Sequence, residues 1–142
     1  MTEFVTAHSS KKVKIGIASF EASMDLKDAI FTEMANAGIK IDATKLDINN
    51  MDFDVGQLAA AALKVDSSKL VRKALFDCLI KSTYDKEKIT TATFEDPAAR
   101  ADYYEIAFAC IKENLAPFFS GLLLGLKAMG IERLVKSNQT SK

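Results

Sequence analysis

Residues 114–126 read NLAPFFSGLLLGL, and almost every side chain in this stretch is apolar or very small. Three interpretations are open: the stretch crosses a membrane, fills the protein's own core, or holds another protein. The uncharged run from residue 115 to residue 126 has 12 residues, whereas a membrane-spanning helix needs about 20. A proline at position 117 and a glutamate at position 113 also disfavour insertion. The membrane interpretation therefore fails, and the stretch belongs to a globular protein.

The composition is that of an ordinary single domain. The chain has 142 residues, of which 49% are hydrophobic and 27% charged. Its 19 basic and 19 acidic side chains give no net charge, so nucleic acid is not expected as a partner, because phosphate binding needs a clustered basic surface. Residues 1–66 carry 7 basic and 10 acidic residues, and residues 67–142 carry 12 and 9. This asymmetry would orient head-to-tail contacts between copies.

The two cysteines and the N-terminus indicate an intracellular protein. Cys78 and Cys110 lie in apolar helical patterns and are expected to be buried free thiols. The first residues, MTEFVTAHSSKK, contain no apolar segment of a signal peptide. We therefore expect a cytoplasmic location and no disulfide.

Changes in apolar spacing predict the secondary structure. Val13, Ile15 and Ile17 alternate with Lys14 and Gly16, which is the pattern of a strand with one buried face. Ile39 and Ile41 alternate in the same way and predict a second strand. The polar segment 42–54 is expected to be a loop. Residues 82–94 are expected to form a hairpin or an extended loop. Helical spacing, with serine or aspartate caps and the Asp96-Pro97 start signal, predicts helices over residues 24–37, 55–65, 97–115 and 118–129. A further helix is predicted to run to residue 81 from a cap at either Ser67 or Ser68.

These helices share an inward-facing apolar side. The residues expected there are Leu26, Ile30, Met34, Leu58, Ala61, Ala62, Val65, Leu75, Cys78, Leu79, Ala107, Phe108 and Ile111, with the choice between Leu70 and Val71 and between Tyr103 and Tyr104 left open. The predicted fold class is α+β and mainly helical, with four or five helices and a small N-terminal β element. A single domain over residues 13–135 is expected between a flexible N-terminal arm, residues 1–12, and a polar tail, residues 136–142.

The sequence offers little for catalysis or for metal binding. The single histidine, His8, lies in the expected arm, and no nucleotide-binding or nucleophile motif is present. The acidic segment DINNMDFD, residues 47–54, fails the calcium-loop pattern, because Asp52 stands where glycine is required and Leu58 where glutamate is required. Asp25 and Asp28 are explained by their place at a helix start. We expect no enzyme, no cofactor and no metal.

Residues 114–126, folded as a helix, would be apolar on nearly every side, so this helix must be covered on several sides. Gly121 and Gly125 are four residues apart, a spacing that lets another backbone approach closely. Cover by the domain's own core and cover by a partner both remain open. On the partner interpretation, the predicted contact residues are Phe118, Phe119, Gly121, Leu122, Gly125 and Leu126.

A series of segments in fixed order resembles the tail assembly chaperones of long-tailed bacteriophages. The segments are ASF at 18–20, MDLKDAIF at 24–31, ALFDCLIKSTYD at 74–85, KIT at 88–90, FEDPAARADYYEIA at 94–107 and NLAPFF at 114–119. The resemblance covers residues 13–125. One departure is Asp85-Lys86, where a tighter Asn-Gly-like turn is expected, and this puts the geometry of the hairpin in doubt.

The resemblance implies a function in viral morphogenesis. Such chaperones are non-virion proteins of the host cytoplasm that bind the hydrophobic tape measure protein and keep it soluble while tail tube protein polymerises around it. Many occur in two forms, the longer made by ribosomal frameshifting, and self-association into an oligomer is expected. The resemblance implies neither catalytic residues nor nucleic-acid or membrane partners.

Three other functions compete with this one. A helical adaptor or regulatory domain would bind one folded protein in a fixed complex, whereas a client-coating chaperone would load in many copies. A metal-independent enzyme would show a polar pocket with perturbed carboxylates. A structural virion subunit would be found in purified particles.

Overall fold

The computed structural model describes residues 2–38, 59–65 and 67–129, and it describes side-chain surroundings as far as Phe118. Within these ranges the fold is mainly helical with a small antiparallel sheet, as the sequence predicts. The expected strand at residues 39–41, the loop at 42–54, the start of the helix expected from residue 55 and the polar tail lie outside the described residues. The division of the chain into arm, domain and tail stays a prediction.

Four short strands form one sheet in chain order. The strands are β1 (Thr2–Val5), β2 (Lys12–Ile15), β3 (Thr83–Tyr84) and β4 (Glu87–Lys88), and each is antiparallel to the next. The predicted strand is confirmed in β2, where Val13 and Ile15 are buried and the alternating Lys12 and Lys14 are exposed.

Residues 2–5 differ from the flexible conformation that the sequence predicted for them. They form β1, whose backbone pairs with β2 from Thr2 opposite Ile15 to Val5 opposite Lys12. Alternate side chains Thr2 and Phe4 are half-buried, and Phe4 packs against the core. The segment is too short and too polar for its alternation to be recognised without its partner strand.

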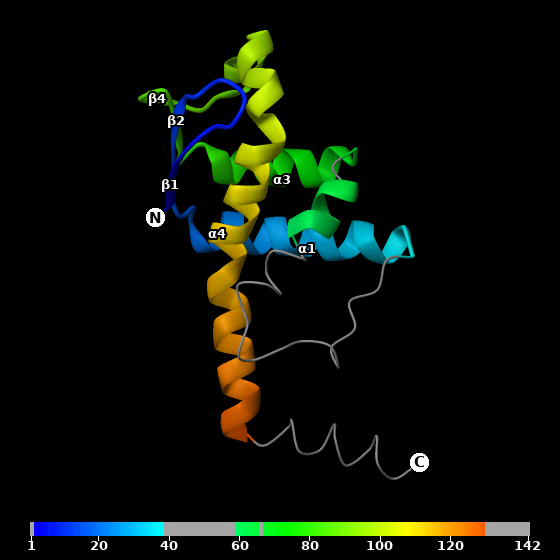
Figure 1. Ribbon diagram of the computed structural model, residues 1–142. Helices are drawn as coiled ribbons and strands as arrows, with labels where there is room; N and C mark the ends of the chain where they lie inside the picture. Colours follow the sequence, from blue (N-terminus) through cyan, green and yellow to red (C-terminus); the bar gives the residue numbers. More distant parts are fainter. Residues whose placement is uncertain (1, 39–58, 66, 130–142) are drawn as a thin grey trace.

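Helices α1 (Phe20–Asn36) and α3 (Lys69–Leu79) lie side by side (Figure 1). Ser19 caps α1 by accepting a hydrogen bond from the Ala22 backbone N–H, and Ser68 caps α3 in the same way. The buried residues of the two helices include the predicted Leu26, Ile30, Met34, Leu75, Cys78 and Leu79. Of the open pair, Val71 is buried and Leu70 is 53% exposed.

Residues 59–64, from the predicted helix 55–65, are helical, and Ala62 and Val65 are buried.

The segment 82–94 contains the β3–β4 hairpin and a short 3-10 helix, η3 (Thr91–Glu95). Both turn residues of the hairpin, Asp85 and Lys86, have positive φ, at 52° and 72°. This is the backbone of a type I′ turn built without glycine. Asp85 and Lys86 therefore form a tight turn, although an Asn-Gly-like pair was expected at these positions.

Helix α4 (Pro97–Met129) is one continuous helix and contains Pro117, whereas the sequence predicted a break at this residue. A proline inside a helix removes one backbone hydrogen bond, and here it does not end the helix. The first part of α4 contacts α1, α3, β2 and η3, and its last turns extend past α1 (Figure 1). The buried residues of its first part include Ile106, Ala107, Cys110, Ile111 and Leu115. Tyr103 packs against Phe76 and Phe94, while Tyr104 is 59% exposed.

Candidate protein-binding surface

The last buried turn of α4 is anchored by Asn114. Its Oδ1 accepts hydrogen bonds from the Ala18 backbone N–H, at 2.8 Å, and from the Ser23 hydroxyl, at 3.3 Å. Its Nδ2 donates to the Cys110 carbonyl oxygen at 2.9 Å. The amide is buried and uses both its donor and its acceptor, so it ties the connection between β2 and α1 to α4 at little net cost of burial.

The same connection is held from the other side through Gly16. Its backbone N–H donates to the Ser82 hydroxyl at 3.1 Å. A Cβ at this position would lie 2.3 Å from the carbonyl oxygen of Lys81, far inside van der Waals contact. Only glycine therefore lets the end of β2 pass this close to the backbone that follows α3.

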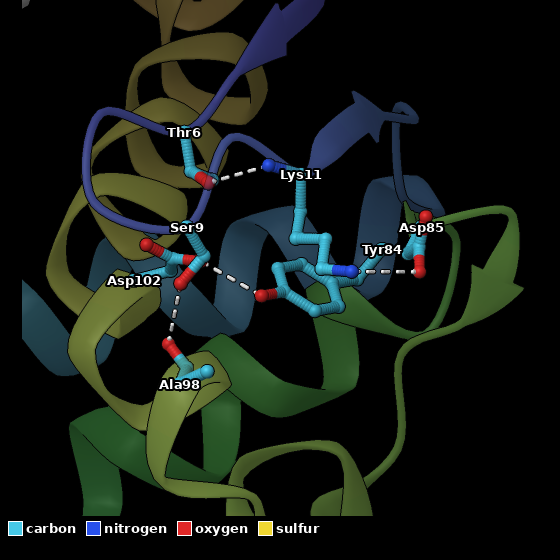
Figure 2. Close-up of polar contacts among 7 residues, drawn as sticks. All are labelled: Thr6, Ser9, Lys11, Tyr84, Asp85, Ala98 and Asp102. Carbon is cyan, nitrogen blue, oxygen red and sulfur yellow. Dashed lines mark hydrogen bonds and ion pairs between the residues drawn. The ribbon is translucent and has the colours of Figure 1, made fainter.

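A second polar cluster lies near the start of α4 (Figure 2). The Tyr84 hydroxyl donates to Asp102 Oδ2 at 2.7 Å, and Asp102 is fully buried. Asp102 Oδ1 has no hydrogen-bond partner. Burial first, and then the hydrogen bond and the charge of Asp102, raise the pKa of Tyr84 to about 12. The phenol therefore remains a donor at every physiological pH.

The loop between β1 and β2, residues 6–11, closes over this cluster (Figure 2). The Lys11 backbone N–H donates to the Thr6 hydroxyl at 3.0 Å, and the Ser9 hydroxyl donates to the Ala98 carbonyl oxygen at 3.1 Å. Lys11 Nζ lies 3.5 Å from an Asp85 carboxylate oxygen, and both side chains are largely exposed. His8 is also exposed in this loop, and its contact is with the neighbouring Ser9.

The two thiols are free and buried, as predicted. Burial raises the pKa of Cys78 to about 12, with smaller contributions from Asp77 and Asp25, and burial also raises the pKa of Cys110. Both sulfurs stay protonated and unreactive at neutral pH. Among the described residues no group of three or more metal-ligating side chains comes together, and no described helix is both long and apolar enough to cross a membrane.

An apolar surface lies where α4 begins to extend past α1. The ring of Phe118 meets the ring of Phe20, with centroids 5.8 Å apart and planes tilted by 58°. Phe118 is half-buried against the core, whereas Phe20 is 72% exposed and Ile17 is 56% exposed. Among the described residues Phe20 is the most exposed large apolar side chain, and an exposed apolar ring packed on a second ring is a candidate protein-binding site.

Of the predicted contact residues, only Phe118 has described side-chain surroundings. Phe119, Gly121, Leu122, Gly125 and Leu126 lie in the last turns of α4, and their side chains lie outside the description. The sequence prediction did not include Phe20 or Ile17. Ile17 was assigned to the buried face of the strand, and Phe20 stood before the expected helix start. Their contribution appears only when α1 begins at Phe20 and brings this ring to Phe118.

Comparison with known proteins gives one clear result. A model of the phage tail assembly chaperone proteins matches residues 16–125 of the chain. The search of curated proteins and the search of solved structures gave no match. The matched range begins at Gly16, runs through α1, α3 and the hairpin, and reaches the last turns of α4. The chain therefore belongs to the phage tail assembly chaperone family.

Proposed function

We propose that this protein binds the hydrophobic tape measure protein and keeps it soluble while tail tube protein polymerises around it. Membership of a chaperone family implies an assembly role without catalysis and tail proteins as partners. The observation that carries the finer proposal is the exposed ring of Phe20 against Phe118, at the base of the last turns of α4, with the exposed Ile17 three residues before Phe20 in the chain. A domain that only had to fold would gain by burying these side chains.

The proposed contact surface continues from Phe118 along α4. Phe118, Leu122 and Leu126 are spaced by four residues, as are Gly121 and Gly125, and each set therefore follows one face of the helix. Phe119 completes the proposed set. The glycines would let an apolar client helix approach the α4 backbone closely, and the larger side chains would cover its apolar stripe, as in helix-in-groove recognition.

Weak individual contacts suit this task. A long client with many apolar segments would hold many copies, and binding of neighbouring copies to one chain raises their effective concentration. Each copy would still leave quickly when tube protein advances along the client. The protein would accordingly act in the host cytoplasm and be absent from the mature virion. Self-association and a longer frameshifted form are part of the same proposal, and no cofactor, nucleic acid or membrane is needed for it.

Co-expression of the full chain with the tape measure protein encoded beside it tests the proposal. We expect the tape measure protein to move from the insoluble to the soluble fraction, and sizing to show several copies of this chain per client. A fixed one-to-one complex with a different folded protein would instead support the adaptor function. Recovery of the chain in purified particles would support a structural subunit.

The variant Leu122→Asp tests whether Leu122 contacts the client or belongs to the protein's own core. If the last turns of α4 bind the client, the variant stays folded and loses solubilisation of the tape measure protein. Tyr104→Asp is the matched control, because Tyr104 is an exposed apolar residue on the same helix, at 59% exposure, and lies outside the proposed surface. Unfolding of Leu122→Asp with an unaffected control would assign this residue to the core.

A further inference from the structure

A hollow of about 370 Å³ lies beside α3, on the side where η3 begins. Its lining takes five residues from α3 and one from η3, namely Lys69, Arg72, Lys73, Phe76, Asp77 and Thr91. Because the five positions on α3 are separated by three or four residues along the stripe, they share one face of the helix. The volume lies at the lower end of the range of about 300–1,000 Å³ that is usual for ligand sites, so the hollow suits a few side chains of a partner.

The cations of this lining gather at the unfavourable end of the helix. Lys69 and Arg72 lie within the first four residues of α3, and Lys73 follows directly. The N-terminal end of a helix carries a partial positive charge, which favours acidic side chains and disfavours basic ones. The first turn of α3 lies within the described residues and holds no acidic side chain. These cations therefore do not serve the helix, whereas they would attract an anionic partner.

The lining itself balances one of these charges. Lys73 Nζ lies 3.3 Å from an Asp77 carboxylate oxygen, and the two side chains are 79% and 52% exposed. Arg72 Nη2 donates to the Ser67 carbonyl oxygen at 3.5 Å, which holds the guanidinium near the start of the helix. Asp77 is the one acid among the described residues that line the hollow, so this lining carries three cations and one carboxylate.

An aromatic ring supplies the apolar part of the same hollow. Phe76 is half-buried, and its ring meets those of Phe94 and Tyr103, with centroids 5.9 Å and 6.3 Å away. These two contacts hold the ring in place and leave part of it at the surface of the hollow. An apolar side chain that packed on this ring would be removed from water together with it, which favours binding. The hollow thus joins a fixed apolar contact to a basic one.

We propose that this hollow binds a short acidic segment of a partner protein, whose carboxylates lie at Lys69 and Arg72 and whose apolar side chain packs on Phe76. The charge of the lining selects the acids, and the ring selects a segment that also carries an apolar residue. Asp77 disfavours a continuous run of negative charge such as a nucleic-acid backbone, and the chain as a whole has no net charge. The site shares no residue with the surface at Phe118, so the inference goes beyond the proposed function and does not depend on it.

A panel of designed peptides tests the site on the full chain. Each peptide places two glutamates and one phenylalanine, in every relative order, in a short glycine–serine background. We expect the best members to bind with dissociation constants of about 0.1–1 mM and to shift the backbone amide signals of Lys69, Phe76 and Thr91 in nuclear magnetic resonance spectra. Glutamine in place of both glutamates should weaken binding about tenfold, and alanine in place of the phenylalanine should weaken it about fivefold.

Variants of the chain separate recognition from folding. Lys69→Gln with Arg72→Gln should weaken binding of the best peptide about tenfold. Lys86→Gln with Lys88→Gln removes the same charge from the exposed hairpin and is the matched control, which should leave binding unaltered. Lys69→Glu with Arg72→Glu should lose the glutamate peptide and bind its lysine counterpart instead, an exchange of specificity that a folding defect cannot produce.

Three results would overturn the proposal. The first is a panel without saturable binding at millimolar peptide, the second is equal binding by wild type and the Lys69→Gln, Arg72→Gln variant, and the third is a set of shifted amide signals that lies away from the hollow. A thymidine oligonucleotide that bound at the hollow more tightly than every peptide would also overturn it, because the site would then belong to nucleic acid.

Discussion

The two connections on either side of β2 are built in opposite ways. The connection from β2 to α1, residues 16–19, is pressed between α4 and the backbone after α3, and its Gly16 and Ala18 N–H groups both donate to buried side chains. The loop from β1 to β2, residues 6–11, lies at the surface and covers a buried carboxyl whose second oxygen has no partner.

The difference shows which contacts position the candidate surface. Asn114 and Gly16 fix the segment that carries Ile17 and leads to Phe20, so the apolar surface beside Phe118 depends on a fully satisfied, close-packed connection. The loop 6–11 and the Tyr84–Asp102 pair instead hold the far end of α4, where a less complete set of hydrogen bonds is tolerated. Buried polar groups stabilise a fold in proportion to how completely they are paired.

The strongest challenge to this comparison is Gly16→Ala. The added methyl would meet the Lys81 carbonyl oxygen, and we expect a loss of about 3 kcal/mol in the free energy of unfolding, measured by urea denaturation. Gly38→Ala is the matched control: it has open space but a φ of 75°, so strain alone should cost about 1 kcal/mol. Equal losses at the two glycines would show that the close approach at Gly16 is unimportant.

Asn114→Ala tests the hydrogen bonds of the same connection. It leaves the buried Ala18 N–H and the Ser23 hydroxyl without their acceptor, and we expect a loss of about 2–3 kcal/mol. Lys112→Ala on the same helix should change stability by less than about 0.5 kcal/mol. An Asn114→Ala protein as stable as wild type would mean that water replaces the amide without penalty.

Tyr84→Phe tests the less complete cluster. Removing the hydroxyl leaves both oxygens of Asp102 unpaired in a buried site, so we expect a loss of about 2 kcal/mol. Tyr84→Phe combined with Asp102→Leu should recover a large part of it, because the site then holds no unpaired polar group. A double variant no more stable than the single one would show that the hydroxyl acts through packing and not through the carboxyl.

Raising the pH tests the Tyr84–Asp102 pair in the wild-type protein. The folded-state pKa of Tyr84, about 12, lies above the ordinary value of about 10, so its stabilising effect is complete below pH 10 and is lost as pH rises to 12. We expect a loss of about 1 kcal/mol from this group, since water at the exposed loop screens the pair. Denaturation at pH 9.5 and 11.5 should show a smaller fall for Tyr84→Phe than for wild type, and parallel falls would exclude this origin.

The smallest effect is expected at the β3–β4 turn, whose Asp85 reaches Lys11 of the exposed loop. Lys86 has a φ of 72°, and Lys86→Gly supplies the residue that a type I′ turn prefers. We expect a gain of about 0.5–1 kcal/mol in thermal or urea unfolding. Lys88→Gly, in the neighbouring strand, should instead be destabilising. A loss at Lys86 would indicate that its side chain contributes more than its backbone strain costs.

Local patterns in the sequence predicted the central elements. Alternation identified β2, helical spacing with serine caps identified α1 and α3, and the Asp96-Pro97 signal placed the start of α4. Two predictions differ from the structure. Thr2–Val5 is a strand because β2 lies beside it, and α4 continues through Pro117, where the sequence suggested two helices.

The sequence by itself determined the fold class, the free buried thiols and the family, since these follow from periodicity, composition and the order of short segments. Only the tertiary structure decided which apolar residues stay exposed, because exposure depends on what packs against each face. It placed Phe20 beside Phe118, left Leu70 exposed, and buried the polar side chains of Asn114 and Asp102. Hydrogen bonds between residues far apart along the chain, such as that from Ala18 to Asn114 across 96 positions, leave no local pattern from which they can be predicted.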